Sequence, residues 1–494
     1  MQLDLEGIHL EYKQGSGQLP KEFWPTYSAF ANTSGGHVIF GVAEPKPQKY
    51  EVVGIQNLSM YKEQLFNNLN NPEKVSYNVV SESDVEEIEF EGKTLLRVYV
   101  KEAPYHKKPI FIKNNIQNSF KRVHEMDQRM SEEEIKYYIA NSLESLDVEI
   151  LVDFSIADLY EPDLNEYKRM VSEKTDIDYT STSLEEFAKQ NGILMPKHDN
   201  GKTTYHPTLA SLLFFGKYYS ILRKVPYFQL DYFRKNKLAD IKWRDRVSSG
   251  DMNFPQMNIF SFYNAVLPKL YQSLEDRFDQ DDGSMERTSY VSDMRAALRE
   301  AFINSIMHAY YGAAEAIKIT AYDDLYEFYN PGNMRVSKES FLMGGVSMPR
   351  NPYLTTCFRR IGLAERSGYG GQKILDVANR NKLRAPDVID AETSTTIRLW
   401  KVDYLHTLPQ LSDRAYKIYS YLYPLVGAKR TEIMENTGLT EHHVKAGTDE
   451  LIELGLVKKI GNTRNTEYIV DLSPEMRISK NKKLIKSLED MWRK

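Results

Sequence analysis

Residues 299–311 read Arg-Glu-Ala-Phe-Ile-Asn-Ser-Ile-Met-His-Ala-Tyr-Tyr, and this stretch decides how the middle of the chain is interpreted. Glu300, Asn304 and His308 recur every four residues, which places them on one face of a helix. A carboxylate and a carboxamide in line can place water and Mg²⁺ beside a triphosphate. The alternative interpretation is an amphipathic helix with a hydrogen-bonded polar seam.

Three further segments accompany this helix. Asn330-Pro-Gly332 follows an expected strand, Pro349-Arg-Asn-Pro352 follows a glycine-containing loop, and Glu365-Arg-Ser-Gly-Tyr-Gly-Gly371 precedes an expected helix. Glycines before a helix N-terminus permit close backbone approach and form an anion site. With the helix, these segments resemble the GHKL-type ATPase fold in the form found in RecG-related bacterial proteins and transcriptional regulators, over about residues 285–402.

This resemblance implies ATP and Mg²⁺ as cofactors. It implies that Asn304 ligates Mg²⁺, that Glu300 orients water and that His308 belongs to the same nucleotide site. The other residues that the resemblance assigns to the nucleotide are Asn330, Gly332, Gly368, Gly370, Gly371, and Thr395 or Thr396.

One position departs from the GHKL pattern. Asn330 stands where typical members have the aspartate that reads the adenine amino group, and Pro331 stiffens the turn. Asparagine still offers an acceptor oxygen. A purely structural domain is therefore the alternative to ATP binding. A P-loop helicase motor is not expected, because Gly92-Lys-Thr94 lacks the upstream glycine of that motif.

The N-terminal region combines Glu6, Glu11 and Lys13 with Ala29-Phe-Ala-Asn-Thr-Ser-Gly-Gly36 and Gly41-Val42. This combination resembles the Schlafen/AlbA-type nucleic-acid-binding domain, over about residues 1–140.

The similarity to Schlafen RNases implies that Glu6, Glu11 and Glu44 form an acidic cluster that holds Mn²⁺ or Mg²⁺ and activates water on a phosphodiester. The alternative is a structural ion pair between Glu11 and Lys13. Nucleic-acid binding is expected whether these carboxylates hold a metal ion or form an ion pair, because several cations could line one phosphate-facing surface. These are Lys13, Lys107, Lys108, Lys121 and Arg122.

Residues 409–472 resemble a winged helix-turn-helix, with three short helices followed by strand, wing and strand. The third helix is predicted to begin after Thr440 and to enter the DNA major groove, while the wing contacts the backbone. The side chains expected to contact DNA are His442, His443, Lys445, Lys458, Lys459 and Arg464. The same helix also carries several acidic residues, which would repel DNA phosphates. A winged helix that binds protein is therefore the alternative.

Composition limits the function classes. The chain has 494 residues, a net charge of −5 and one cysteine, Cys357, which excludes an internal disulfide framework and a multi-cysteine zinc site. No segment is apolar over the roughly 18 residues that a membrane helix needs. The start of the chain lacks a signal-peptide pattern, so we expect a cytoplasmic protein.

These patterns predict a multidomain α/β and α+β protein. Its parts are a Schlafen/AlbA-like domain (1–140), a connecting α+β region (141–284), a GHKL-like domain (285–402), a winged helix (409–472) and a basic tail (473–494). The leading hypothesis is a homo-oligomeric regulator of transcription that binds DNA, or RNA, and senses a nucleotide. The alternatives are a metal-dependent nuclease, for instance in phage defence, and a protein-binding scaffold.

Overall fold

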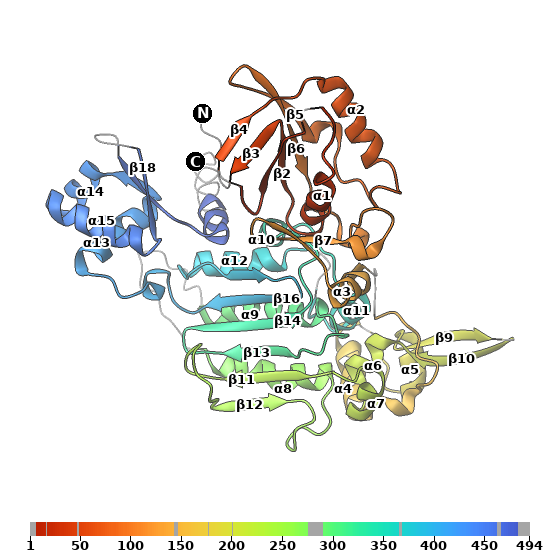
Figure 1. The fold of residues 1–494 in the computed structure, drawn as a ribbon. Helices are drawn as coiled ribbons and strands as arrows, with labels where there is room; N and C mark the ends of the chain where they lie inside the picture. The colour runs from red at the N-terminus through yellow and green to blue at the C-terminus, as the bar shows by residue number, and fades with distance from the viewer. Residues whose placement is uncertain are drawn as a thin grey trace, which may run out of the picture. The chain divides into compact units, whose positions relative to one another are not determined.

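The chain divides into two units, Met1–Glu144 and Ser145–Lys494, in the computed structural model (Figure 1). The residues that the structure describes are 6–15, 17–46, 49–142, 147–175, 177–199, 201–274, 290–364, 368–461 and 466–482. None of the helices formed by these residues is long and apolar enough to cross a membrane.

The N-terminal unit is built on a four-stranded sheet of order β1-β2-β6-β5, in which β1 and β2 are parallel and the other pairs are antiparallel. Its helix α1 buries Phe23, Tyr27 and Phe30 in a core with residues from α2 and the sheet. Outside the sheet, β3 pairs with β4 and β7 pairs with β8. The elements are β1 (Leu10–Lys13), α1 (Phe23–Asn32), β2 (Gly36–Phe40), β3 (Val42–Lys46), β4 (Lys49–Val52), α2 (Leu58–Leu69), β5 (Val85–Phe90), β6 (Lys93–Val100), β7 (Phe120–Val123), β8 (Met126–Arg129) and α3 (Glu132–Ser142).

Local sequence explains two boundaries of this unit. The hairpin between β5 and β6 turns at Glu91 and Gly92, which both have positive φ, as a two-residue turn requires. Ser131 starts α3 through the predicted cap: its hydroxyl accepts from the N–H of Glu134, and the Glu134 carboxylate accepts from the N–H of Ser131.

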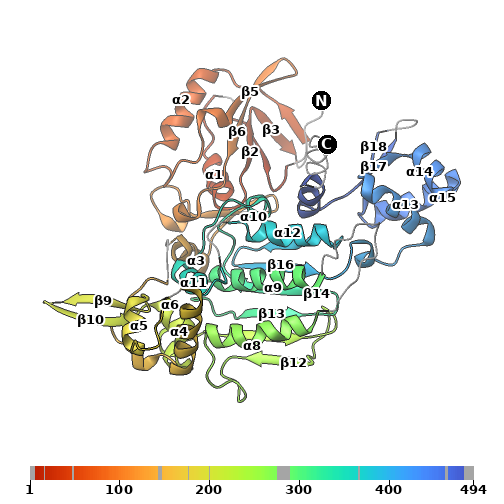
Figure 2. The same cartoon turned by 180° about the vertical axis from the view of Figure 1, so that it is seen from behind.

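The second unit contains a six-stranded sheet of order β12-β11-β13-β14-β16-β15. Only the β11–β13 pair is parallel among these strands. Figure 2 shows α8, α9 and α12 across one face of the sheet. The elements are β11 (Leu230–Arg234), β12 (Asp245–Ser248), α8 (Ile259–Gln272), α9 (Tyr290–Met307), β13 (Ile317–Ala321), β14 (Leu325–Pro331), α10 (Lys338–Met343), α11 (Pro352–Arg360), α12 (Gly370–Arg380), β15 (Asp387–Asp390) and β16 (Ser394–Trp400).

The domain boundary predicted at residue 284 is wrong. Two strands and one helix from the supposed connecting region, β11, β12 and α8, belong to the central sheet and its helical layer. They bury Tyr232, Phe262 and Val266 in the same core as α9. The central domain therefore begins before the segment that resembles the GHKL fold.

Residues 147–225 form a helical module with one hairpin. Its aromatic side chains reach the core of the central sheet: Tyr167 packs edge-on against Phe260, and Phe214 packs edge-on against Phe358. The elements are α4 (Glu161–Thr175), α5 (Leu184–Gln190), β9 (Leu194–Asp199), β10 (Lys202–Pro207), α6 (Leu209–Phe215) and α7 (Tyr218–Lys224).

The C-terminal module has three helices and a small sheet of order β17-β19-β18. Thr440 caps the third helix as predicted, since its hydroxyl accepts from the N–H of His443, and Gly438 makes the preceding turn with φ of +66°. The segment 462–465, which contains Arg464, and the tail from residue 483 lie outside the described residues. The elements are α13 (Asp413–Leu425), β17 (Gly427–Lys429), α14 (Arg430–Thr437), α15 (Glu441–Glu453), β18 (Val457–Ile460) and β19 (Glu467–Val470).

Asp147 joins the helical module to α11. Its buried carboxylate accepts from the N–H of Leu354, 207 residues away, at 2.8 Å. Burial raises the pKa of Asp147 to about 6, and the N–H groups at the start of α11 and the charge of Arg335 oppose that shift only in part. The ionised carboxylate therefore costs folding free energy at neutral pH.

We predict that Asp147→Asn stabilises the protein at pH 7.5 by roughly 2–3 kcal/mol, because the amide cannot ionise. The pKa of Asp147 in the folded state lies above its ordinary value. The protonated side chain therefore contributes to the free energy of unfolding in full at low pH, and this contribution is lost as pH rises through about 6. Chemical denaturation at pH 4.5 and pH 7.5 measures the difference, which should shrink at pH 4.5. The exposed Asp153→Asn is the control, and an equal effect of Asp147→Asn at both pH values would contradict the prediction.

Candidate nucleotide and nucleic-acid sites

Helix α9 presents Glu300 and Asn304 side by side, and the Asn304 amide donates to the Glu300 carboxylate at 3.3 Å. The start of α12 comes so close that a Cβ at Gly370 would lie 2.2 Å from Glu300 Oε1 and 3.0 Å from Asn304 Nδ2. A Cβ at Gly371 would lie 2.3 Å from the carbonyl oxygen of Phe341. Glycine at position 370 therefore lets the N-terminal turn of α12 meet the polar stripe of α9, and glycine at position 371 lets the same turn pack against α10.

Gly368 has a different neighbour from Gly370 and Gly371. It has φ of +68° and packs against the backbone of Val346, while its carbonyl accepts from the N–H of Gly345 at 3.2 Å. The preceding residues 365–367 lie outside the described residues. Of the three glycines implied to cradle phosphate, Gly370 thus lies beside Asn304, Gly371 packs against Phe341 of α10, and Gly368 contacts the loop after α10.

A cavity of about 40 Å³ opens beside Asn304. A cavity needs a volume of roughly 10–15 Å³ to hold one water molecule, so this cavity has room for only a few. Asn330 on β14 and Thr395 on β16 are directly paired across the sheet and contribute to one wall. The lining residues are Asn304, His308, Asn330, Asn333, Met334, Arg335, Val336, Phe341, Met348, Thr395 and Ile397.

Backbone contacts fix the orientation of the Asn330 side chain. Its NH₂ group donates to the carbonyls of Pro331 and Gly332, at 3.0 and 3.4 Å. Both partners are acceptors, so the side-chain oxygen is the atom left to accept from a ligand. The Thr395 hydroxyl donates to the same Gly332 carbonyl at 2.8 Å, whereas Thr396 lies on the opposite face of β16 and does not line the cavity.

Two arginines that the sequence interpretation did not assign lie in the cavity wall or directly behind it. Arg335 is 8% exposed and lines it, while Arg350 is 1% exposed and donates to the Asn333 carbonyl at 2.8 Å. Burial, with the charges of Arg350 and then Arg335, lowers the pKa of His308 to about 3. His308 therefore acts as a neutral imidazole at this site and not as a cation.

Arg350 and Asn351 come from the quoted Pro349–Pro352 segment, but the sequence did not reveal their structural role. Arg350 fits beneath Gly332, where a Cβ would lie 2.6 Å from the guanidinium. Asn351 donates to the carbonyls of Met307 and Ala309 at 3.1 and 2.8 Å, and so closes the C-terminal end of α9. This segment holds His308 in place.

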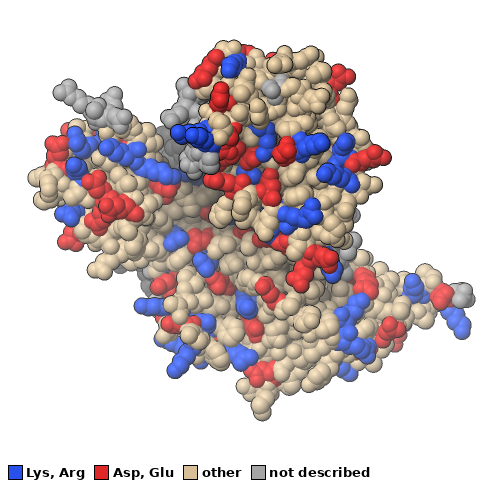
Figure 3. All heavy atoms as spheres, viewed as in Figure 1, with Lys and Arg blue, Asp and Glu red and all other residues tan. Residues whose placement is uncertain are grey.

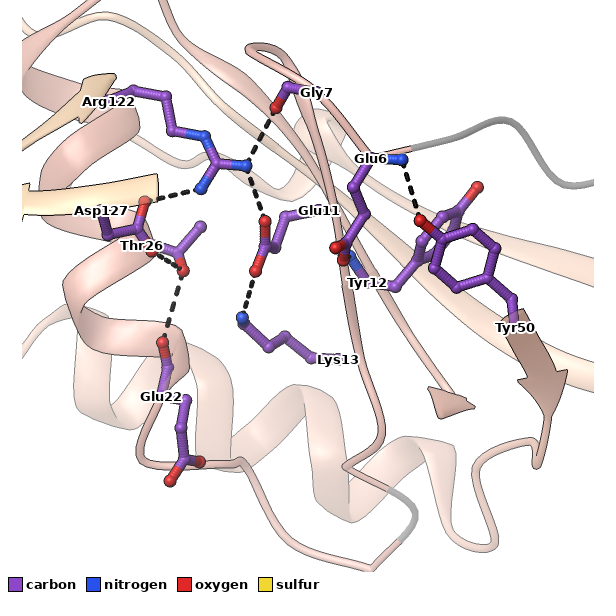
Figure 4. Close-up of polar contacts among 10 residues, drawn as sticks. All are labelled: Glu6, Gly7, Glu11, Tyr12, Lys13, Glu22, Thr26, Tyr50, Arg122 and Asp127. Atoms are coloured by element: carbon purple, nitrogen blue, oxygen red, sulfur yellow. Dashed lines mark hydrogen bonds and ion pairs between the residues drawn. The ribbon is translucent and has the colours of Figure 1, made fainter. Parts of the chain in front are cut away.

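In the N-terminal unit, two acidic residues, Glu11 and Asp127, flank the buried guanidinium of Arg122 (Figure 4). The side chain of Arg122 is 1% exposed, donates to Glu11 at 2.6 Å and to Asp127 at 2.7 Å, and also donates to the Gly7 carbonyl at 2.9 Å. Lys13 donates to the other oxygen of Glu11. The ion pair between Glu11 and Lys13, the structural alternative considered for these residues, is therefore present.

Glu6, Glu11 and Glu44, the acidic residues implied by the Schlafen resemblance, lie close enough for their charges to interact, but their side chains have different surroundings. Glu6 accepts from the N–H of Tyr12 at 2.7 Å, whereas Glu11 is occupied by Arg122 and Lys13, and Glu44 is exposed on β3. Burial raises the pKa of Glu6, and the charges of Glu11 and Glu44 add to that rise. Among the described residues, no group of three or more His, Cys, Asp and Glu side chains could hold a metal ion.

The structure also corrects part of the predicted phosphate-facing surface. Arg122 and Lys108 are buried; Lys108 donates to the Asn32 carbonyl at 2.8 Å and to Glu102 at 2.6 Å, so neither side chain can reach a phosphate. Lys121 is paired with Glu134, and Lys13 with Glu11. Lys107 is exposed, beside the ring of Tyr77.

Helix α15 carries His442, His443 and Lys445 on its exposed face, as predicted. Lys458 and Lys459 are exposed on β18, where Lys458 pairs with Asp471 at 2.9 Å. Figure 3 shows a row of Lys and Arg side chains along the upper part of this module, near β18, with Asp and Glu side chains below it. On the face shown, positive charge therefore gathers beside β18.

Three family models match separate stretches of the chain. They are described as "Schlafen, AlbA_2" (residues 6–131), "Domain of unknown function (DUF8451)" (residues 136–231) and "Putative ATP-dependent DNA helicase recG C-terminal" (residues 314–399). No curated protein matches the chain.

Two solved structures match the chain at low TM-scores. The DIP2311 protein from Corynebacterium diphtheriae is 15% identical, with a TM-score of 0.40, over 96% of this chain and 93% of that chain. The N-terminal domain of a RecG-related protein from Nitrosomonas europaea is 26% identical, with a TM-score of 0.19, over 25% of this chain and 82% of that chain. At these TM-scores neither likeness establishes a shared fold. The family models show that this mixed α/β multidomain protein contains a Schlafen/AlbA_2 domain at residues 6–131 and a RecG-related, HATPase-type domain at residues 314–399.

Proposed function

We propose that this protein is a nucleic-acid-binding regulator whose HATPase-type domain binds ATP with Mg²⁺. The observation that carries the nucleotide part is the meeting of three polar elements at one place. Asn304 of α9 lines the same cavity as Asn330 and Thr395, and it also contacts the start of α12 at Gly370. An amide acceptor, a hydroxyl and a helix N-terminus are the groups that a base and its phosphates require.

The polar groups of these residues match those that ATP and Mg²⁺ require. The Asn330 oxygen would accept from the amino group of adenine, with Thr395 beside it. The side chain of Asn304 would ligate Mg²⁺, which would neutralise phosphate charge, and the first N–H groups of α12 would face the phosphates. The side chain of Tyr369, the N-cap residue, forms no hydrogen bond with these N–H groups. Glu300 is the carboxylate placed to orient water.

Two features govern how tightly a nucleotide would bind. Asn330 supplies an acceptor without the negative charge of an aspartate, which weakens its hydrogen bond to an amino group. The cavity of about 40 Å³ is far smaller than a nucleotide, so side chains at its edge, such as Phe341 and Met348, must move on binding. We therefore propose binding and sensing, and not rapid turnover, as the role of the domain.

We infer that the C-terminal module is a winged helix that binds DNA. The order α13, β17, α14, α15, β18, β19 supports this inference, as does the exposure of His442, His443 and Lys445 on the third helix. One such helix contacts few base pairs, and a homo-oligomer would present several at once. The Schlafen/AlbA_2 domain supports a second nucleic-acid contact on the same chain. Because the two binding domains are linked, binding by one would raise the effective concentration of nucleic acid at the other.

We predict that Thr395→Ala lowers the affinity for a fluorescent ATP analogue about tenfold in the presence of Mg²⁺, because the hydroxyl that lies beside Asn330 is lost. Thr396→Ala is the matched control, since the neighbouring residue on β16 faces away from the cavity. Fluorescence titration measures both affinities. Equal affinities for the two variants would place the nucleotide elsewhere.

We predict that Lys445→Glu combined with Lys459→Glu weakens binding to duplex DNA at least tenfold at 100 mM salt and lowers the salt dependence of the affinity. Each phosphate contact contributes about 0.9 to the slope of log K against log salt concentration, so losing two contacts should lower the slope by about 1.8. Fluorescence anisotropy measures the binding.

Lys417→Glu, on the exposed side of α13, is the control and should leave duplex binding unchanged. If MgATP acts as the regulatory ligand, it must change the DNA affinity of the parent, and DNA must change the MgATP affinity by the same factor. A parent protein that binds duplex DNA with no salt dependence would contradict the DNA part of the proposal.

A further inference from the structure

The connection between β11 and β12 is both basic and aromatic. Residues 235–244 read Lys-Asn-Lys-Leu-Ala-Asp-Ile-Lys-Trp-Arg, which is four cations and one aspartate in a protein whose net charge is −5. β12 is the edge strand of the central sheet, so this connection lies at the border of the domain and outside the layers that bury side chains. Figure 3 shows Lys and Arg side chains at this end of the sheet.

Trp243 forms a supported but open aromatic surface. The indole packs against Phe233, with 5.9 Å between ring centroids, and the guanidinium of Arg246 lies 5.5 Å from its centroid. The residue nevertheless stays 51% exposed, and the adjacent Ile241 is 87% exposed. A large aromatic side chain held by two contacts but left half in solvent marks a binding surface more than a packing site.

Backbone hydrogen bonds hold the connection in place. The N–H of Arg244 donates to the carbonyl of Arg234 at 2.7 Å, and the N–H of Asp323 donates to the carbonyl of Asn236 at 2.9 Å. The Asp240 carboxylate accepts from the N–H of Lys237 at 3.0 Å. Trp243 is therefore presented by an ordered segment, which lowers the entropy cost of binding.

The cations around Trp243 are available to an anionic partner. Among the ion pairs that the described residues form, none includes Lys237, Lys242 or Arg244, and all three are exposed. Two nearby aspartates are engaged with other cations: Asp245 pairs with Lys269 at 2.7 Å, and Asp323 pairs with Arg234 at 2.8 Å. Asp240, within the connection, accepts from the N–H of Lys237. The surface thus keeps a positive charge next to its aromatic ring.

We propose that the β11–β12 connection is a binding site for single-stranded nucleic acid, with a base stacked on Trp243 and the flanking phosphates on Lys242, Arg244 and Lys237. This site rests on the proposed function only in that both require the chain to bind nucleic acid. An exposed ring flanked by cations is the arrangement that binds single strands without sequence preference. A duplex keeps its bases stacked internally and offers the indole no face.

The test uses the full-length chain and a fluorescein-labelled 20-nucleotide thymidine strand. Trp243→Ala should weaken binding about tenfold, and Lys242→Glu with Arg244→Glu should lower the salt slope by about 1.4, because each phosphate contact contributes about 0.7 for single strands. Lys197→Glu with Lys202→Glu, exposed cations on the β9–β10 hairpin, is the control with the same change in charge. Unchanged melting temperatures establish that the variants fold.

Each outcome separates the two proposals. Loss of thymidine-strand binding in the β11–β12 variants, with duplex binding retained, supports this site. Equal single-strand affinity in the parent, the variants and the control overturns it and leaves the proposed function standing, whereas a parent that binds neither strand nor duplex removes both. The site is also overturned if these variants lose binding only to vesicles of phosphatidylcholine and phosphatidylglycerol, or if they only lower the mass of the protein in light scattering. Those results would assign the surface to a membrane or to a second copy.

Discussion

The close approach of α12 to α9 is the constraint on which the central domain depends. Helix α9 buries Ala297, Leu298 and Phe302 against the sheet and its neighbouring helices. The polar stripe formed by Glu300 and Asn304 faces the start of α12. Because residue 370 has no side chain, the start of α12 approaches Glu300 and Asn304 more closely than a Cβ would allow. Any other residue at position 370 would have to displace the Glu300 carboxylate or shift α12 away from α9. Either change would alter the surroundings of Asn304, which lines the cavity.

Much of this arrangement could be predicted from local patterns. The four-residue spacing in α9, the glycines before α12 and the cap at Thr440 are signals carried by a few neighbouring residues, and each appears in the structure. The extent of the central domain could not be predicted in the same way. Strand β11 pairs with β13, more than eighty residues later, and neither the length nor the hydrophobicity of β11 indicates its partner. Arg335 was missed for a similar reason, since its place at the cavity is set by tertiary packing.

Burial of charge is the other property that the sequence did not reveal. Arg122 looks like a surface cation beside Lys121, yet it lies beneath the first strand between two carboxylates. A guanidinium at such depth requires both partners, since removing one leaves an uncompensated charge that typically costs about 3–5 kcal/mol. Glu11 and Asp127 thus hold Arg122 in place beneath β1, so the Glu11 carboxylate is already engaged by cations.

Helix α11 is held at its beginning by side chains from two distant parts of the chain. Asp147 accepts from its first turn, and Asn351 ties the same turn to the end of α9. The helical module, α11 and the wall of the cavity at His308 therefore form one mechanically continuous chain of contacts. A shift of the end of α9 would therefore be transmitted through Asn351 to α11 and to the hydrogen bond between Leu354 and Asp147.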